Sequence, residues 1–192
     1  MRKLALSAAC LATVALAACG NSTTPSTAQV AATVNGTVIS MPAYDAAVQS
    51  LRGRLEQHTG HAVNVKTTAG AKQLAGIQAA GLRELIAETV VEQMAASHHL
   101  SVSDADVDAT LQRLQSTAGD ADALIAELGS SGLSDADTRA AIRVLLLQQK
   151  LRAANPAGYD SAYSAALRDA HVTVYAAPCT TQHAYPACVQ GL

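Results

Sequence analysis

The chain has 192 residues, and its 13 Lys and Arg against 15 Asp and Glu give a formal net charge of −2 at pH 7. This balance argues against binding to nucleic acid or electrostatic docking on a lipid surface, because both need a concentrated patch of positive charge. The sequence lacks Phe and Trp and has five Tyr, so its core must be built from Leu, Val, Ile and Ala. Such small aliphatic residues favour closely packed helices in a single domain of ordinary size.

The first eighteen residues have the pattern of an export signal. Arg2 and Lys3 precede the apolar residues 4–15, a stretch too short to span a bilayer comfortably, and Leu-Ala-Ala-Cys follows at 16–19. This segment resembles the lipobox of bacterial lipoproteins, whose cysteine is acylated and becomes the mature N-terminus. The resemblance implies that Cys19 carries lipid such as palmitate. It also implies that the protein is anchored to a membrane of the cell envelope, on the extracytoplasmic face.

The cysteines predict one disulfide in the exported protein. Cys10 leaves with the signal and Cys19 carries lipid, so only Cys179 and Cys188 remain as thiols. An oxidising compartment favours a bond between them, and closing this short loop is expected to stabilise the tail by roughly 2–3 kcal/mol. A metal site that adds His183 is the alternative, although these three ligands fall short of a closed zinc set.

The predicted domain organisation is simple. Residues 19–29 are polar and predict a flexible tether, residues 30–175 predict one helical domain, and residues 176–192 form a tail with the cysteine pair. Asn35-Gly36 stands between two runs rich in β-branched residues, which predicts a β-hairpin at the start of the domain.

Helical spacing and capping residues predict the other elements. Ser40 caps a first helix that fades near Gly60, and a polar loop leads to a long central helix over about 71–98. Ser103 and Asp106 form a reciprocal capping pair for the next helix. The remaining predictions are a short helix over 120–128, a helix over 138–153, a small helix over 160–170 and a closing strand over 172–175.

Four segments in chain order resemble the N-terminal chaperone domain of the SurA and PrsA foldases. They are residues 34–40, 85–93, 100–108 and 132–139. The resemblance covers about 30–175 and implies a mainly helical fold in which the strand at 30–34 pairs with the strand at 172–175. Family members with prolyl isomerase activity insert a parvulin domain after the last chaperone helix. Too few residues separate Arg152 from the closing strand to hold one, so the protein is expected not to be an enzyme.

Candidate site residues are few. Tyr44, Val48, Leu51 and Met94 are candidates for contact with a bound polypeptide, but residues at helical spacing are more often core residues, and both interpretations stay open.

Two histidine pairs have a metal-like spacing, namely His58 with His61 and His98 with His99. Histidines at helix ends are the simpler interpretation. No nucleophile elbow, phosphate-binding glycine loop or zinc-helix motif accompanies them, so no catalytic residue, metal or cofactor is expected.

The resemblance implies a lipid-anchored, chaperone-like protein that binds unfolded or partly folded exported proteins on an aliphatic surface, without nucleotide or nucleic acid. Two alternatives stay open. One is a structural or assembly lipoprotein that grips a single envelope protein. The other is an isomerase that works with a catalytic domain supplied by a partner.

Overall fold

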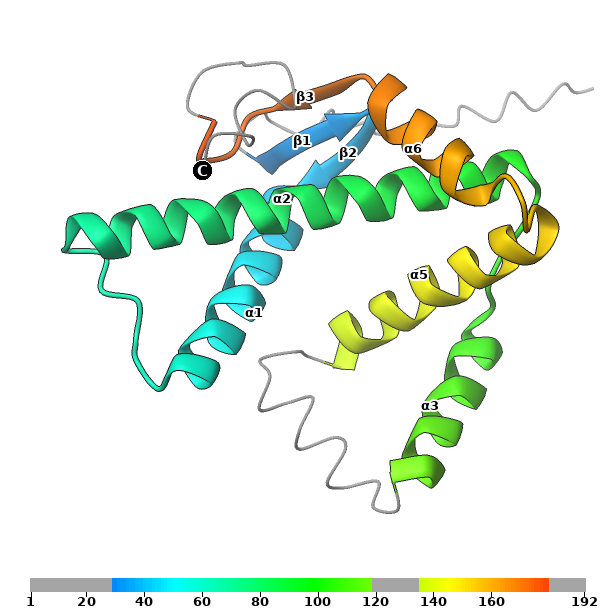
Figure 1. Cartoon of the computed structure of the whole chain (residues 1–192), viewed down its shortest axis with the longest axis horizontal. Coiled ribbons are helices and arrows are strands. Elements are labelled where there is room, and N and C mark those ends of the chain that lie inside the picture. Colours follow the sequence, from blue (N-terminus) through cyan, green and yellow to red (C-terminus); the bar gives the residue numbers. More distant parts are fainter. Residues whose placement is uncertain (1–28, 119–134, 180–192) are drawn as a thin grey trace, which may run out of the picture.

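The chain folds into a mainly helical domain with a small three-stranded sheet (Figure 1). The computed structural model describes residues 29–118 and 135–179. The elements are β1 (Val30–Val34), β2 (Thr37–Ser40), α1 (Met41–Thr59), α2 (Thr68–Ser97), α3 (Asp104–Ala118), α5 (Asp135–Ala154), α6 (Tyr159–Asp169) and β3 (Val172–Val174). This architecture confirms the predicted fold class. Within the described ranges, no helix combines the length and the hydropathy that a bilayer span needs.

The sheet is antiparallel, and its strand order is β2-β1-β3. Asn35 and Gly36 connect β1 to β2 with φ values of 50° and 84°, the left-handed values that a tight hairpin turn requires. Val34 pairs with Thr37 across this turn and with Val172 of β3 on the other side. The structure therefore confirms both the predicted hairpin and the predicted pairing of the first strand with the closing strand.

Capping residues set the ends of the first two helices. Ser40 Oγ accepts a backbone hydrogen bond at 3.3 Å in the first turn of α1, and α1 ends at Gly60, where φ is 69°. The second helix begins at Thr68 rather than near residue 71. Thr67 caps it by accepting a hydrogen bond from the backbone N–H of Gly70 at 3.0 Å, so the preceding loop is shorter than predicted.

The later elements lie close to their predicted ranges. Asp106 N–H donates to Ser103 Oγ at 3.2 Å, and Ser103 N–H donates to Asp106 Oδ2 at 3.0 Å, which confirms the capping pair at the start of α3. Helices α5 and α6 each extend over the predicted segment, with ends shifted by a few residues. The short helix predicted over 120–128 lies outside the described residues.

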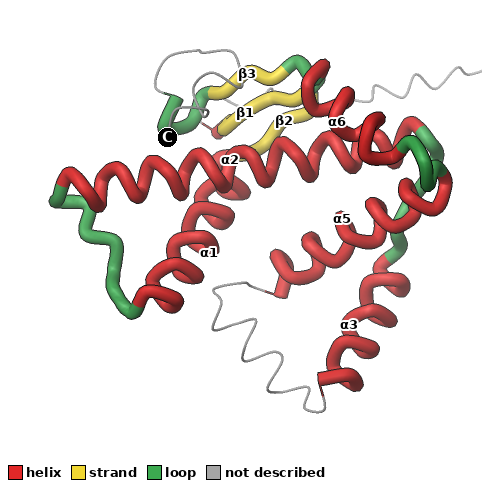
Figure 2. Tube along the Cα trace, in the orientation of Figure 1, coloured by secondary structure: helices red, strands yellow, loops and turns green. Residues whose placement is uncertain are grey.

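Helix α2 is the centre of the molecule, as its sequence predicts. Helices α1, α5 and α6 and strands β1 and β2 all contact it, and the tube trace shows it running beneath the sheet (Figure 2). Its buried Leu82 and Ile86 belong to a cluster shared with the sheet and α1. Its buried Val91 belongs to a second cluster with Leu147 and Leu151 of α5. Burial on several sides explains why α2 is apolar around much of its surface.

The chain stays packed for a few residues beyond β3. Ala176 and Cys179 are buried in the cluster that lies against the sheet, and Cys179 is disulfide-bonded. Cys188 lies outside the described residues, so its pairing with Cys179 stays a prediction. Cys19, the export signal and the tether also lie outside the described residues.

Candidate functional site

A cleft lies where α1, α2 and α5 approach one another. Its volume is about 260 Å³. This is below the roughly 300–1,000 Å³ of sites for drug-sized ligands, so the cleft suits a single side chain better than a large cofactor. The residues that line it are Ala43, Ala46, Ala47, Ser50 and Arg54 of α1, Glu84, Leu85 and Glu88 of α2, and Asp137, Ala140 and Ala141 of α5.

Helical periodicity gathers these residues. On α1, Ala43, Ala47 and Ser50 recur every three or four positions, which places them on one face of the helix. On α2, Glu84 and Glu88 are one turn apart and share a face in the same way. Because the alanine side chains are short, the helices leave an open slot with apolar walls between them.

Glu88 is the acidic group with the most perturbed environment in the cleft. Burial, together with repulsion from the neighbouring carboxylates of Glu84 and Glu92, raises the pKa of Glu88 to about 7. Within the described ranges, no Lys, Arg or His forms an ion pair with Glu88. When Glu88 is ionised, no cation among the described residues compensates the cost of its burial and the repulsion from Glu84 and Glu92.

Arg54, the one cation among the described residues that line the cleft, is paired with Glu84 rather than with Glu88. Arg54 lies 3.9 Å from a carboxylate oxygen of Glu84, and 44% and 49% of their side chains are exposed, so the pair is weak. Asp137 of α5 adds a further carboxylate to the lining. The lining thus carries more negative than positive charge.

Ser50 adds an unsatisfied polar group. Its side chain is buried, with 6% of the residue exposed, and its Oγ has no hydrogen-bond partner. A serine in a helix often bonds a carbonyl of the preceding turn, which would satisfy the hydroxyl internally. Here the hydroxyl stays unpaired beside the cleft, and an unpaired buried polar group is unfavourable until a partner reaches it.

This chemistry suits the binding of a group with an aliphatic part and a polar or positive end. Among the described residues, no three His, Cys, Asp or Glu side chains converge to hold a metal ion. The two histidine pairs noted in the sequence, His58 with His61 and His98 with His99, are solvent-exposed.

A second cavity, of about 290 Å³, lies between the β1–β2 turn, α2 and α6. Gln93 of α2 holds the turn beside this cavity. Its Nε2 donates to the Val34 carbonyl at 2.8 Å and to Thr37 Oγ1 at 2.9 Å, and its Oε1 accepts from Asn35 Nδ2 at 2.8 Å. Asn35 Oδ1 in turn accepts from the backbone N–H of His171 at 2.8 Å. These bonds hold the β1–β2 turn to α2 and to the residue before β3, so the polar groups beside this cavity serve the packing of the domain.

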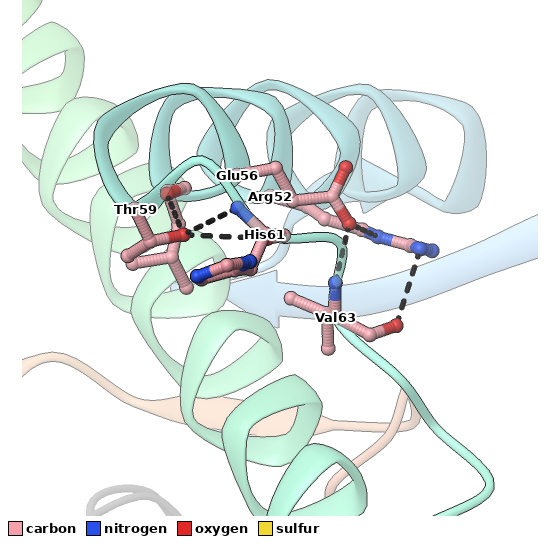
Figure 3. A network of polar contacts seen from close by, with 6 residues as sticks. Arg52, Glu56, Thr59, His61 and Val63 are labelled. Carbon is pink, nitrogen blue, oxygen red and sulfur yellow. Dashed lines mark hydrogen bonds and ion pairs between the residues drawn. The ribbon is translucent and has the colours of Figure 1, made fainter.

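A polar clamp of Arg52, Glu56 and Val63 holds the loop that joins α1 to α2 (Figure 3). Glu56 Oε1 accepts hydrogen bonds from Val63 N–H at 2.8 Å and from Arg52 Nε at 2.7 Å. The bond from Val63 and the neighbouring Arg52 guanidinium lower the pKa of Glu56. At the end of the helix, Thr59 Oγ1 donates to the Leu55 carbonyl at 2.9 Å. The Glu56 carboxylate is therefore ionised at neutral pH.

The candidate polypeptide-binding residues do not form one exposed surface. Tyr44 is a core residue, because only 3% of it is exposed and its hydroxyl donates a hydrogen bond to the Ala177 carbonyl. Burial, with a smaller effect of Asp45, raises the pKa of Tyr44 to about 12. A bound polypeptide would therefore reach this side chain only if the core opened, and its contact with a polypeptide stays a prediction.

The other three candidates are half-buried. Val48 and Leu51 lie on α1 where it crosses Gly81 of α2, and Met94 packs against both core clusters and lines the second cavity. Contact of these residues with a polypeptide stays a prediction.

Sequence reasoning did not find the polar residues of the cleft. Ser50 and Glu88 lie within segments that were interpreted only as helical, and Asp137 lies within the segment 132–139, which was noted for its family resemblance. One signal was present in the sequence. Glu84, Glu88 and Glu92 repeat every four residues, and like charges at this spacing disfavour an isolated helix, which indicates a special environment.

The fold and the cleft define a class of protein, namely a helical domain whose N-terminal hairpin is closed by a C-terminal strand and whose helices leave an open slot. A family model for the SurA-like N-terminal domain matches residues 2–152. The chain belongs to this chaperone-type family, as its four sequence segments predicted. No curated protein and no solved structure gives a significant match to the chain. The family match ends within α5, so α6 and β3 lie beyond it.

Proposed function

We propose that the protein is a lipid-anchored, extracytoplasmic chaperone-like protein that binds non-native exported polypeptides and has no isomerase activity. Membership of the SurA-like family supports the chaperone class, because domains of this kind bind unfolded polypeptides. The export signal and the lipobox-like sequence that ends at Cys19 support the anchor. The short connection between α5 and β3, which leaves no room for a parvulin insert, supports the lack of isomerase activity.

The observation that carries this proposal is the open cleft between α1, α2 and α5 in a domain of that family. Ala43, Ala140 and Ala141 at its rim are solvent-exposed, so an aliphatic side chain of a client can enter without movement of any helix. Burial of apolar surface contributes about 25 cal/mol per Å². A few small contacts of this kind give weak and adaptable binding, which suits the holding of many different unfolded chains.

An aggregation assay tests the proposal. The purified full-length exported protein is expected to slow the aggregation of several denatured exported proteins at near-stoichiometric ratios. Ala140→Leu should fill the cleft and weaken this protection. Ala153→Leu makes the same change at an exposed position of the same helix, outside the cleft, and should keep the protection. Equal protection by both variants would move the binding surface away from the cleft.

Two further measurements separate the alternatives. A proline-limited refolding reaction, which takes about tens to hundreds of seconds without catalysis, should proceed at the same rate with and without the protein. Any acceleration would favour an isomerase. Crosslinking in intact cells is expected to capture many exported proteins, whereas one stoichiometric partner would favour an assembly factor.

A substitution tests the lipid anchor. Cys19→Ser should abolish partitioning of the protein into the detergent phase if this cysteine holds the lipid.

A further inference from the structure

The cleft between α1, α2 and α5 has polar features that the holding of apolar segments does not require. Its lining places the carboxylates of Glu84, Glu88 and Asp137 around a slot that holds one cation, Arg54. Arg54 is paired with Glu84, so it leaves the charge of Glu88 uncompensated. A ligand of positive charge is therefore complementary to this cleft.

Ser50 gives a second and independent indication of a ligand. Its buried Oγ lacks a hydrogen-bond partner and lies at the wall of the same cleft. A hydroxyl oxygen accepts hydrogen bonds, and an ammonium group offers three donors and no acceptor. An ammonium group that reaches this wall of the cleft would offer a donor to the Ser50 oxygen and a compensating charge to the Glu88 carboxylate.

The walls of the cleft indicate which chemical group carries the positive charge of the ligand. Ala47 of α1 and Ala140 of α5 give the same cleft apolar walls, and its volume of about 260 Å³ admits one long side chain. Lysine has this form, because its four-carbon stem packs on apolar surface while its ammonium group stays with polar partners.

We propose that the cleft is a subsite for a lysine side chain of the bound polypeptide, with the ammonium group at Glu88 and Ser50 and the stem between the alanines of α1 and α5. The inference rests on the proposed function, and it adds a preference for segments in which lysine lies among apolar residues. The sequence between α3 and α5 contains no Lys or Arg, so that connection cannot supply the positive group.

Matched peptides test the subsite. Three short labelled peptides of Ala and Leu carry at their centre lysine, norleucine or glutamate, so that the first two have the same stem with and without the charge. Their binding to the full-length exported protein is measured by fluorescence polarisation at pH 8. The lysine peptide is expected to bind about tenfold more tightly than the norleucine peptide. The glutamate peptide is expected to bind more weakly than either of them.

Three substitutions locate the effect. Glu88→Gln should erase the preference for lysine, so that the lysine and norleucine peptides bind about equally. Glu92→Gln removes the same charge one turn along α2, outside the cleft lining, and should keep most of the preference. Ser50→Ala should reduce the preference in part.

A pH series gives a separate readout. The charged groups around Glu88 are Arg54 from α1, Glu84 and Glu92 from α2, and Asp137 from α5. Since the pKa of Glu88 is about 7, the preference for the lysine peptide over the norleucine peptide should decline as the pH falls through 7.

The outcomes distinguish the subsite from the proposed function. Equal binding of the lysine and norleucine peptides by the wild type would overturn the subsite and leave the holding function in place. A preference for lysine that survives Glu88→Gln would overturn its location. If no peptide binds and aggregation is not slowed, the proposed function fails and the subsite fails with it.

Discussion

Replacing Glu88 by Gln is expected to stabilise the protein at alkaline pH. The pKa of Glu88 in the folded protein is about 7, against an ordinary value of 4.5, because of burial and of repulsion from Glu84 and Glu92. Below pH 4.5 the carboxyl is protonated in both the folded and the unfolded state, so folding carries no penalty. Above pH 7 it is ionised in both states, and the folded state carries the full penalty. Gln keeps the shape of the side chain without that charge.

The size of the gain follows from the two pKa values. At 1.36 kcal/mol per pKa unit, the difference between about 7 and 4.5 sets an upper limit of about 3 kcal/mol. Because the carboxyl is only partly buried, solvent screening lowers this figure, and we expect a gain of about 1–2 kcal/mol at pH 8. In a protein of this size, each kcal/mol raises the melting temperature by roughly 2–4 °C.

Thermal unfolding of the wild type and of Glu88→Gln at pH 4 and pH 8 measures the effect. The variant should melt at a higher temperature at pH 8 and at nearly the same temperature at pH 4. Glu92→Gln, at an exposed position on the same helix, should give a smaller gain. The reasoning is refuted if Glu88→Gln is equally or less stable at pH 8, since the carboxylate would then have a compensating partner in the folded protein.

Four further substitutions test the contacts that shape the domain. Gln93→Ala removes three hydrogen bonds between α2 and the hairpin and should lower the free energy of unfolding by about 1–3 kcal/mol in urea titrations. Asp106→Asn should lower the melting temperature at neutral pH but not in acid. The pKa of Asp106 is lowered below 3.8 by hydrogen bonds from Ser103 and by Lys150, so its contribution is lost as the pH falls through the lowered pKa. Gly70→Ala should destabilise the protein, because the added Cβ would lie 1.9 Å from a backbone oxygen, whereas Gly76→Ala, with open space around it, should stabilise α2 by up to about 1 kcal/mol in the same titration.

The features that the sequence predicted well depend on local chemistry. Asn35 and Gly36 specify a hairpin because few other residues adopt the required φ values. Ser103 and Asp106 specify a helix start because each side chain bonds the backbone of the other. In both cases all the groups that decide the structure lie within four residues of one another.

The prediction was less accurate where distant contacts decide. The start of α2 depends on Thr67, but Gly70 three residues later made this segment resemble a loop. In the structure, the backbone of Asn64 lies so close to Gly70 that only a residue without a side chain fits. Tyr44 likewise gave no local sign that its hydroxyl would bond the Ala177 carbonyl, which is remote in the sequence.

The cleft could not be predicted in this way, because it exists only where α1, α2 and α5 come together. The repeat of Glu84, Glu88 and Glu92 shows that one face of the central helix carries charge, but only the fold shows that Glu88 is desolvated there. Packing would favour an apolar residue at such a position, and the carboxylates of Glu84 and Glu92 oppose the ionisation of Glu88. Ionised Glu88 therefore lowers the stability of the folded protein. Under the proposed function, a positive group of a bound polypeptide would restore that stability by pairing with the Glu88 carboxylate.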